Sequence, residues 1–444
     1  MSRRISVSRL TRWGAVVLFA GTVLTQPLVQ AADQFIGVAT IRLGPLANIG
    51  LGLAGGWLDY MQLLNDRDGG IHGVKLVWEE CEFEYKPDRN VECYERLKTK
   101  GLPFWNTFNT PASYALTDRL PQDKIPLMNV ALGRADAADG RVFPWVFPLV
   151  TTYHSANAAR VQFIGQKEGG IDKLKGKKVA FVYHDTAFGK EVLPLMELQA
   201  KKYGFDLLKV PVAPPGAEQQ SQWLQIRQQK PDWVVMRTLG VMTSAAIKAA
   251  QRVGFPSDRM ISGWWSGTTE DMLAAGDAAK GYHAAALFGD GPNFPVIQEI
   301  IKRYYSGGKK GNMPDPKLVG SSSYNQGVSQ GIIMMEAVKV AMDRYGKGPV
   351  TGEQVRWALE HMNLDDKRIR ELGASGLMQP IKTSCADHEG GGAILINQWD
   401  GSKWVLQKEW VKADRSVVRP FLESLATSYA KEKGITPRDC SKER

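Results

Sequence analysis

The chain has 444 residues, 43% of them hydrophobic, so it is long enough for two domains and apolar enough to bury a core in each. Its formal net charge is +10. The charged residues are interspersed along the sequence and form no Lys/Arg block, which argues against a nucleic-acid-binding tail. After residue 31 no stretch approaches about 18 consecutive apolar residues, which argues against a membrane span in that part.

The first 31 residues have the layout of a secretory signal peptide. Four arginines precede an apolar run over residues 13–24, namely Arg3, Arg4, Arg9 and Arg12. Residues 29–31 (Val-Gln-Ala) fit a small-x-small cleavage site. A membrane anchor is the alternative, but a run of about 12 residues is too short for a hydrocarbon core of about 30 Å. We predict a signal peptide over residues 1–31 and a mature protein in the periplasm.

The four cysteines indicate disulfide bonds, because an even number in an exported chain is typical of them. Three pairings are possible. We favour Cys81–Cys93 and Cys385–Cys440, since each pair lies within one region of the chain. A zinc site is the rival, but no C-x-x-C motif occurs and the histidines are scattered.

From residue 35 the sequence alternates segments typical of strands and of helices. In the first half we expect strands over 35–43, 75–80, 102–108 and 126–130, with helices over 50–66, 87–100 and 111–120. In the second half we expect strands over 178–184, 205–210, 233–238 and 260–263, with helices over 153–167, 189–203, 219–229, 242–253 and 268–275. This alternation predicts an α/β fold with parallel sheets that carry helices on both faces.

The rest of the chain returns to both halves. A strand over 282–288 leads back toward the first half, and helices over 323–345 and 352–361 follow. Strands over 393–398 and 404–409 flank a hairpin turn, and a helix with a charged tail spans 420–444. No linker rich in Pro, Gly or Ser separates the two halves, so we expect the chain to cross between the two lobes more than once. We predict a first lobe from 32–150 plus about 283–350, a second from 151–282 plus about 351–410, and a C-terminal extension over 411–444.

Two motifs resemble those of enzymes, but each lies in an unsuitable context. Gly50, Gly52 and Gly55 match the spacing of a dinucleotide fingerprint, yet they fall inside a predicted helix and not directly after a strand. Ser329 lies in a G-x-S-x-G sequence with no strand before it. Glycines that allow close helix packing are the simpler interpretation. We predict no catalytic residue, no metal site and no cofactor.

The predicted strand ends are better suited to binding a ligand, because open parallel sheets bind ligands beyond the carboxyl ends of their strands. Those ends are residues 42–45, 107–111, 129–133, 184–188, 238–240 and 264–266. They combine hydroxyl groups, helix-start N–H groups and large aromatic rings, with few acids or bases in a catalytic arrangement. This composition favours a pocket for a small solute.

Several runs resemble a known family. Residues 37–45 include Gly37, Gly44 and Pro45, and residues 64–76 read LNDRDGGIHGVKL. Residues 183–189 (YHDTAFG) and 249–255 (AAQRVGF) extend the likeness, which covers about 35–345. Together they resemble the leucine/isoleucine/valine-binding branch of the periplasmic binding proteins.

The resemblance implies a type I periplasmic binding protein fold: two doubly wound lobes, a multi-strand hinge and a ligand in the cleft. It implies a monomeric, non-enzymatic protein that captures a small solute and delivers it to the membrane permease of an ABC importer, without a nucleic-acid partner. Hinge candidates are residues 148–153 and 280–283, which include Tyr153 and Tyr282.

The resemblance also implies ligand contacts by position. Asn109 and Thr110 correspond to the turn that holds the ligand carboxylate. The further contacts, from a second loop and from the other lobe, are Ala131, Leu132, Gly133, Phe188, Thr238, Trp264 and Trp265.

The chain departs from the amino-acid binders at the position that holds the ligand ammonium. Those proteins place a carboxylate near residues 264–266, whereas the nearest acids here are Glu270 and Asp271. Arg42 replaces a usually uncharged residue and is a candidate partner for a carboxylate. We expect an amino acid-like ligand or an aromatic or aliphatic acid, and another small uncharged solute is the alternative ligand. The alternatives are a sensor component of the same fold and a nucleotide-dependent oxidoreductase.

Overall fold

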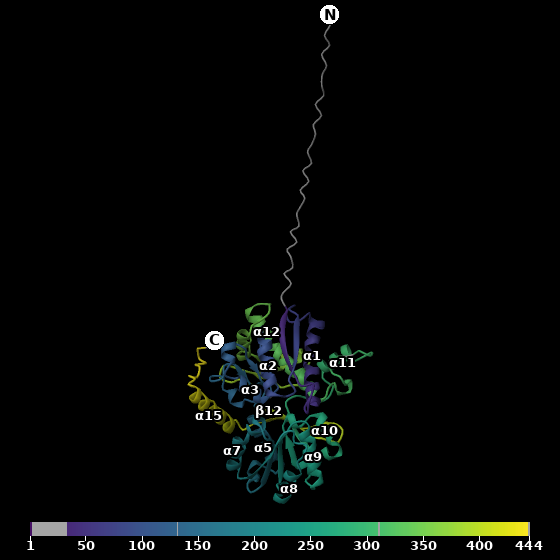
Figure 1. Cartoon of the computed structure of the whole chain (residues 1–444), viewed down its shortest axis with the longest axis vertical. Helices are drawn as coiled ribbons and strands as arrows, with labels where there is room; N and C mark the ends of the chain where they lie inside the picture. Colours follow the sequence, from purple (N-terminus) through teal and green to yellow (C-terminus); the bar gives the residue numbers. More distant parts are fainter. Residues whose placement is uncertain (2–32, 131, 310, 443–444) are drawn as a thin grey trace. The chain divides into compact units, whose positions relative to one another are not determined.

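A computed structural model describes residues 1, 33–130, 132–309 and 311–442, and residues 32–444 form one compact unit (Figure 1). Apart from Met1, the predicted signal peptide lies outside the described residues, so its prediction stays as stated. Among the described helices, none combines the length and the apolar character needed to cross a bilayer.

The first half of the chain forms short parallel pairs of strands. β1 (Gln34–Thr40) pairs with β2 (Leu76–Glu82), and β3 (Leu127–Met128) pairs with β4 (Val146–Phe147). The helices between them are α1 (Ala47–Asp68), α2 (Pro87–Lys98), α3 (Thr110–Leu116) and α4 (Leu120–Asp123). The predicted strand over 102–108 shortens to a bridge between Trp105 and Leu127, in a segment where Pro103 has no N–H to donate.

The second half builds one seven-stranded sheet of order β13-β12-β9-β8-β7-β5-β6. Its parallel part comprises β5 (Lys178–His184), β6 (Asp206–Val212), β7 (Trp233–Arg237), β8 (Met260–Ser262) and β9 (His283–Ala286). β12 (Ala393–Trp399) and β13 (Trp404–Lys412) complete it as antiparallel strands. The predicted α/β fold with parallel sheets is thus confirmed.

Helices surround this sheet, and Figure 1 shows several of them in the lower lobe. They are α5 (Tyr153–Lys167), α6 (Ala187–Lys190), α7 (Leu193–Tyr203), α8 (Gln220–Gln229), α9 (Val241–Arg252) and α10 (Thr269–Ala275). The helix predicted over 189–203 is split in two, and Pro194 stands in the first turn of its second part, where proline is well tolerated.

After β9 the chain forms helices again. These are α11 (Pro295–Tyr304), α12 (Ser322–Tyr345), α13 (Gly352–Glu360) and α14 (Asp366–Glu371), and a short antiparallel pair joins β10 (Asn363–Leu364) to β11 (Ile381–Lys382). α12 packs along α1 (Figure 1). Glycines permit this close contact: a Cβ at Gly56 would lie 2.1 Å from the carbonyl oxygen of Tyr324, and one at Gly327 would lie 2.3 Å from that of Leu53. The two glycine motifs therefore lie at, or beside, a helix–helix interface.

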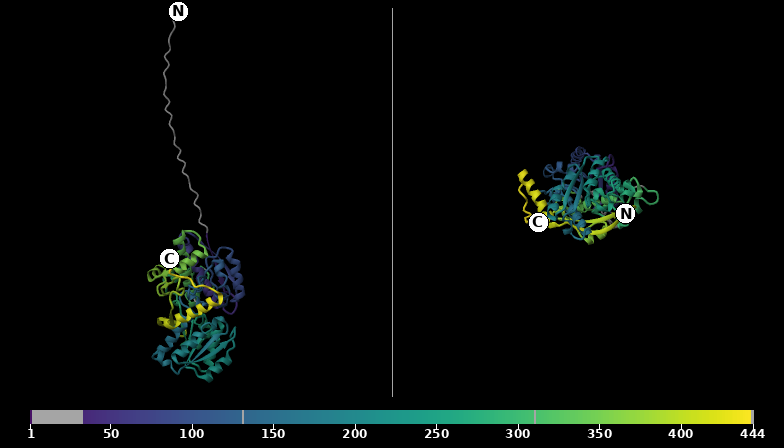
Figure 2. Two further views of the ribbon diagram at one scale, coloured as in Figure 1. Left: turned by 90° about the vertical axis from the view of Figure 1, so that its left-hand side faces the viewer. Right: turned by 90° about the horizontal axis from the view of Figure 1, so that it is seen from below.

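The C-terminal helix α15 (Arg415–Lys433) begins five residues before the predicted start and contains Pro420. Asp414 caps it by accepting a hydrogen bond from the N–H of Ser416. α15 contacts both α5 and a 3-10 turn at Ala135–Ala138, and Figure 2 shows it alongside the junction of the two lobes.

Both disulfide pairings favoured from the sequence are present. Cys81 in β2 bonds to Cys93 in α2, and Cys385 bonds to Cys440 in the tail after α15. The described part of the chain has no free cysteine. The second bond connects residues 55 positions apart, so it holds the C-terminal tail against the body of the protein.

Candidate ligand-binding site

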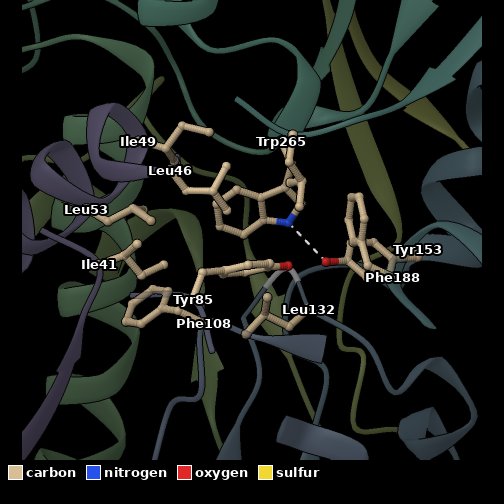
Figure 3. Close-up of a pocket in the computed structure, with 11 residues that line it drawn as sticks. Ile41, Leu46, Ile49, Leu53, Tyr85, Phe108, Leu132, Tyr153, Phe188 and Trp265 are labelled. Carbon is tan, nitrogen blue, oxygen red and sulfur yellow. Dashed lines mark hydrogen bonds between the residues drawn. The ribbon is translucent and has the colours of Figure 1, made fainter. Parts of the chain in front are cut away.

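A small, partly open hollow lies at the carboxyl ends of the parallel strands, where a ligand is expected in this type of sheet (Figure 3). Both halves of the chain contribute to its wall. The lining residues are Ile41, Leu46, Ile49, Leu53, Tyr85, Phe108, Leu132, Tyr153, Phe188, Leu239 and Trp265. An apolar wall with a few polar groups is typical of a small-molecule site.

The hollow has an apolar end and a polar end. Figure 3 shows aliphatic and phenyl side chains such as Leu53 and Phe108 at one side, while the hydroxyls of Tyr85 and Tyr153 approach the indole nitrogen of Trp265 at the other. Trp265 Nε1 donates to the hydroxyl oxygen of Tyr153 across 3.0 Å. Burial raises the pKa of Tyr153 to about 12, so its hydroxyl keeps its proton at neutral pH.

Local backbone geometry directs Phe108 into this hollow. Phe108 has a φ of 46°, in the left-handed region that a phenylalanine rarely adopts. Its N–H donates to the side-chain oxygen of Asn106, and Asn109 directly after it caps α3. The turn is therefore held by side-chain hydrogen bonds at the point where it faces the hollow.

Three of the predicted contacts lie on the wall of the hollow, namely Leu132, Phe188 and Trp265. Trp264 lies beside them, because its ring stacks on Tyr153 with centroids 5.5 Å apart. Ala131 lies outside the described residues. The structure thus brings the aromatic part of the predicted set together.

The expected carboxylate-binding turn forms a buried corner next to the hollow. Asn109 accepts from the N–H of Ala112 and donates to the carbonyl of Tyr85, while Thr110 Oγ1 accepts from the N–H of Gly133 across 3.4 Å. Glu191 fills this corner: a Cβ on Gly133 would meet its Oε2 at 2.2 Å. The protein's own carboxylate therefore lies where the resemblance implies a ligand carboxylate.

Arg42, Thr238 and Tyr282 are not among the residues that line the hollow. Arg42 forms an ion pair with Glu80, with 2.7 Å between Nη2 and Oε2. Thr238 donates from its backbone N–H to Ser266 Oγ, and Tyr282 donates from its hydroxyl to the carbonyl of Ser266 across 3.0 Å. Roles in ligand contact for Arg42 and Thr238, and in a hinge for Tyr153 and Tyr282, stay predictions.

Two charged residues near the polar end were not predicted from the sequence. Arg237, the last residue of β7, packs its guanidinium against Tyr153 and Phe188, at 3.6 and 4.2 Å from the ring centroids. Glu191 accepts from the N–H of Ala135 across 2.8 Å. The sequence did contain one indication of Arg237, because this arginine is the single charged residue in the otherwise apolar strand WVVMR.

The described residues contain no group of three or more His, Cys, Asp or Glu side chains arranged to hold a metal ion. The dinucleotide spacing lies within α1, where a Cβ on Gly52 would approach Ser323 Oγ to 2.1 Å. These glycines therefore contact protein and leave no room for a phosphate group.

Comparison with known proteins identifies the class. The profile of the family described as periplasmic binding protein matches residues 33–403. A solved structure from the Pseudomonas fluorescens group, named as an ABC transporter permease, is 46% identical with a TM-score of 0.86 and covers 92% of this chain and 99% of its own. The chain belongs to the periplasmic binding protein family and has its type I fold, as the sequence resemblance indicated.

More distant structures share the fold. A branched-chain amino acid ABC transporter protein from Thermus thermophilus with bound valine is 21% identical, with a TM-score of 0.71 and coverage of 88% of this chain and 99% of its own. A solute-binding protein from R. palustris in complex with benzoate is 18% identical, with a TM-score of 0.65 and coverage of 86% and 98%. A search of curated proteins gave no match.

Proposed function

We propose that this chain is an exported solute-binding protein that captures one small organic molecule between its lobes and delivers it to the permease of an ABC importer. The hollow in Figure 3 carries this proposal, because side chains from both halves of the chain close around one apolar space. The expected solute is amino acid-like or an aromatic or aliphatic acid. One protein of this fold has bound valine and another is in complex with benzoate, so the fold accepts both an amino acid and an aromatic acid.

The mechanism is a closure of two lobes around the solute. Leu132 and Phe108 come from the first half of the chain, while Phe188 and Trp265 come from the second. A solute between them buries apolar surface on both sides, worth about 25 cal/mol per Å². Bound solute therefore favours the closed form, and the closed form presents both lobes together to the permease.

The test is a thermal-shift screen of the purified protein with amino acids, short aliphatic acids, aromatic acids, alcohols and NAD. A solute at 100 times its Kd adds roughly 2.7 kcal/mol to the free energy of unfolding. We expect a shift with one solute class. A shift with NAD alone would contradict the proposal and favour a nucleotide-dependent enzyme.

A matched pair of variants locates the site. Leu132→Phe adds volume to the wall of the hollow, whereas Leu406→Phe adds the same volume at a side chain that is 47% exposed. We expect the first to weaken solute binding and the second to leave it unchanged. Equal affinities in both variants would place the site elsewhere.

A further inference from the structure

The guanidinium of Arg237 is buried without an acidic partner. The side chain is 4% exposed, and its Nε donates to the carbonyl oxygen of Phe188 across 2.6 Å. Its Nη2 is buried and has no hydrogen-bond partner among the residues that the structure describes. A buried charge of this kind is costly unless another group pairs with it. Arg237 therefore has hydrogen-bonding capacity that the described part of the protein does not use.

Arg237 lies next to the polar end of the hollow, behind two of the rings that line it. Its guanidinium contacts the rings of Tyr153 and Phe188, which both line the hollow. Figure 3 shows the hydroxyls of Tyr85 and Tyr153 close to each other, and the charge of Arg237 acts on both groups. This aromatic support fixes the plane of the guanidinium, which suits recognition of a planar anion by two parallel hydrogen bonds.

The charges around the site leave an excess of positive charge. Arg160 is also buried, and it donates to two neutral groups, the carbonyl of Met236 and the side-chain oxygen of Asn157. Arg134, by contrast, is paired with Asp136. Glu191 is the carboxylate whose charge acts on Arg237, while the charged group that acts on Arg160 is the guanidinium of Arg237 itself. A bound anion would balance this charge.

We propose that the solute carries one carboxylate and an apolar body, and that Arg237 binds this carboxylate. The inference rests on the proposed function and specifies its solute class. The carboxylate takes the unused Nη2 of Arg237 near the two tyrosine hydroxyls, and the apolar body extends toward Leu53 and Phe108. An α-amino acid fits less well, because a zwitterion adds no net charge and leaves the excess positive charge in place.

The first experiment compares solutes of one carbon skeleton by calorimetric titration. Acids of two to eight carbons, straight, branched and aromatic, are each tested beside the corresponding alcohol and α-amino acid; 4-methylpentanoate, 4-methylpentan-1-ol and leucine form one such set. We expect an acid to bind at least tenfold more tightly than its alcohol and its amino acid. Tighter binding of an alcohol or an amino acid would overturn the carboxylate assignment and leave the solute-binding function intact.

The second experiment uses Arg237→Met with Arg303→Met as its matched control, since Arg303 lies on α11, is 39% exposed and is already paired with Glu299. We expect Arg237→Met to weaken binding of the best acid on the order of 100-fold, as for loss of a buried charged partner, and Arg303→Met to leave it unchanged. Unchanged affinity in Arg237→Met would overturn the proposal.

Two controls separate a binding defect from a folding defect. The melting temperature of ligand-free Arg237→Met should not fall below that of the wild type, because the substitution removes an unpaired buried charge. Arg237→Lys, which keeps the charge but not the planar fork, should bind with intermediate affinity. If no acid, alcohol or amino acid binds the wild-type protein, both the carboxylate assignment and the proposed function are contradicted.

Discussion

Arg438 donates a hydrogen bond from Nη2 to Oε1 of Glu360 across 2.6 Å, and so ties the tail after α15 to the end of α13. The same carboxylate oxygen lies 3.3 Å from Nε2 of His388. Glu360 is 4% exposed. The C-terminal extension is therefore held by a buried charged group as well as by the disulfide between Cys385 and Cys440.

This arrangement predicts a loss of stability in acid. Burial raises the pKa of Glu360, but the hydrogen bonds from His388 and Arg438 and the charge of Arg356 outweigh it and lower the pKa to about 2. An acid with a lowered pKa stabilises the folded state above its unfolded pKa of about 4.5 and loses that contribution as the pH falls toward 2. We expect Glu360→Gln to cost roughly 3 kcal/mol at pH 7 in urea denaturation, and progressively less from pH 4.5 to pH 3.

Glu353→Gln is the control, because Glu353 lies on the same helix with its side chain 60% exposed. It should change stability by less than about 0.5 kcal/mol. An equal loss from Glu360→Gln at pH 7 and pH 3 would show that shape and not charge matters at this position.

The two disulfides should differ in what they contribute. Their sequence separations are 12 for Cys81–Cys93 and 55 for Cys385–Cys440. Loop-closure entropy predicts contributions of about 3 and about 4 kcal/mol, since a longer loop restricts the unfolded chain more. We expect urea denaturation of the Cys385→Ser/Cys440→Ser double variant to show a greater loss than Cys81→Ser/Cys93→Ser. A greater loss of stability in Cys81→Ser/Cys93→Ser would mean that the Cys385–Cys440 disulfide does not hold the C-terminal tail in place.

The contact between α1 and α12 should not tolerate a methyl group at Gly327. A Cβ there would meet the carbonyl oxygen of Leu53 at 2.3 Å, and a backbone atom in a packed helix pair moves with difficulty. We expect Gly327→Ala to cost about 1–3 kcal/mol. Gly348→Ala is the control, because no atom lies within 4 Å of its Cβ position. If both variants unfold at the same urea concentration, the two helices separate readily.

Elements with strong local signals could be predicted well from the sequence. The helix expected over 153–167 and the strand expected over 178–184 coincide with α5 and β5. Their apolar spacing and the polar or glycine residues around them are local features. Both disulfides were also predicted, because each pair lies within one region of the chain.

The polar end of the hollow could not be predicted in the same way. Arg237 is buried by Tyr153 and Phe188, which are 84 and 49 residues away in the chain, and the sequence alone does not show these contacts. Arg42 illustrates the converse, since its position in the first loop favoured a ligand contact, whereas its side chain pairs with Glu80. A sequence shows that a charged residue ends a predicted strand, but it does not show which residue pairs with that charge in the folded protein.

Glu191 predicts how stability and solute binding depend on pH near neutrality. Its Oε2 is buried without a hydrogen-bond partner in the described part of the chain. Burial raises its pKa to about 7, although the charge of Arg237 and the N–H of Ala135 lower it. The other charges that act on it are those of Asp136 and Arg134; the uncharged Tyr114, Tyr153 and His154 also lie near it.

An acid with a raised pKa binds its proton more tightly in the folded chain than in the unfolded one. Its ionisation therefore costs stability as the pH rises from about 4.5 to about 7, and the cost stays constant above that range. We expect Glu191→Gln to be more stable than the wild type by up to roughly 3 kcal/mol at pH 8 and equally stable at pH 4.5. The control, Glu197→Gln, alters a side chain that is 52% exposed and should show no such difference.

The same ionisation should oppose binding of a carboxylate at Arg237, because it places a second negative charge beside the guanidinium. Titration calorimetry of the best acid should therefore show constant affinity below pH 6 and a decrease above pH 7. In Glu191→Gln the affinity should stay level over this range. A decrease of the same size in this variant would show that another group titrates, and an increase above pH 7 would mean that the solute does not bind as an anion.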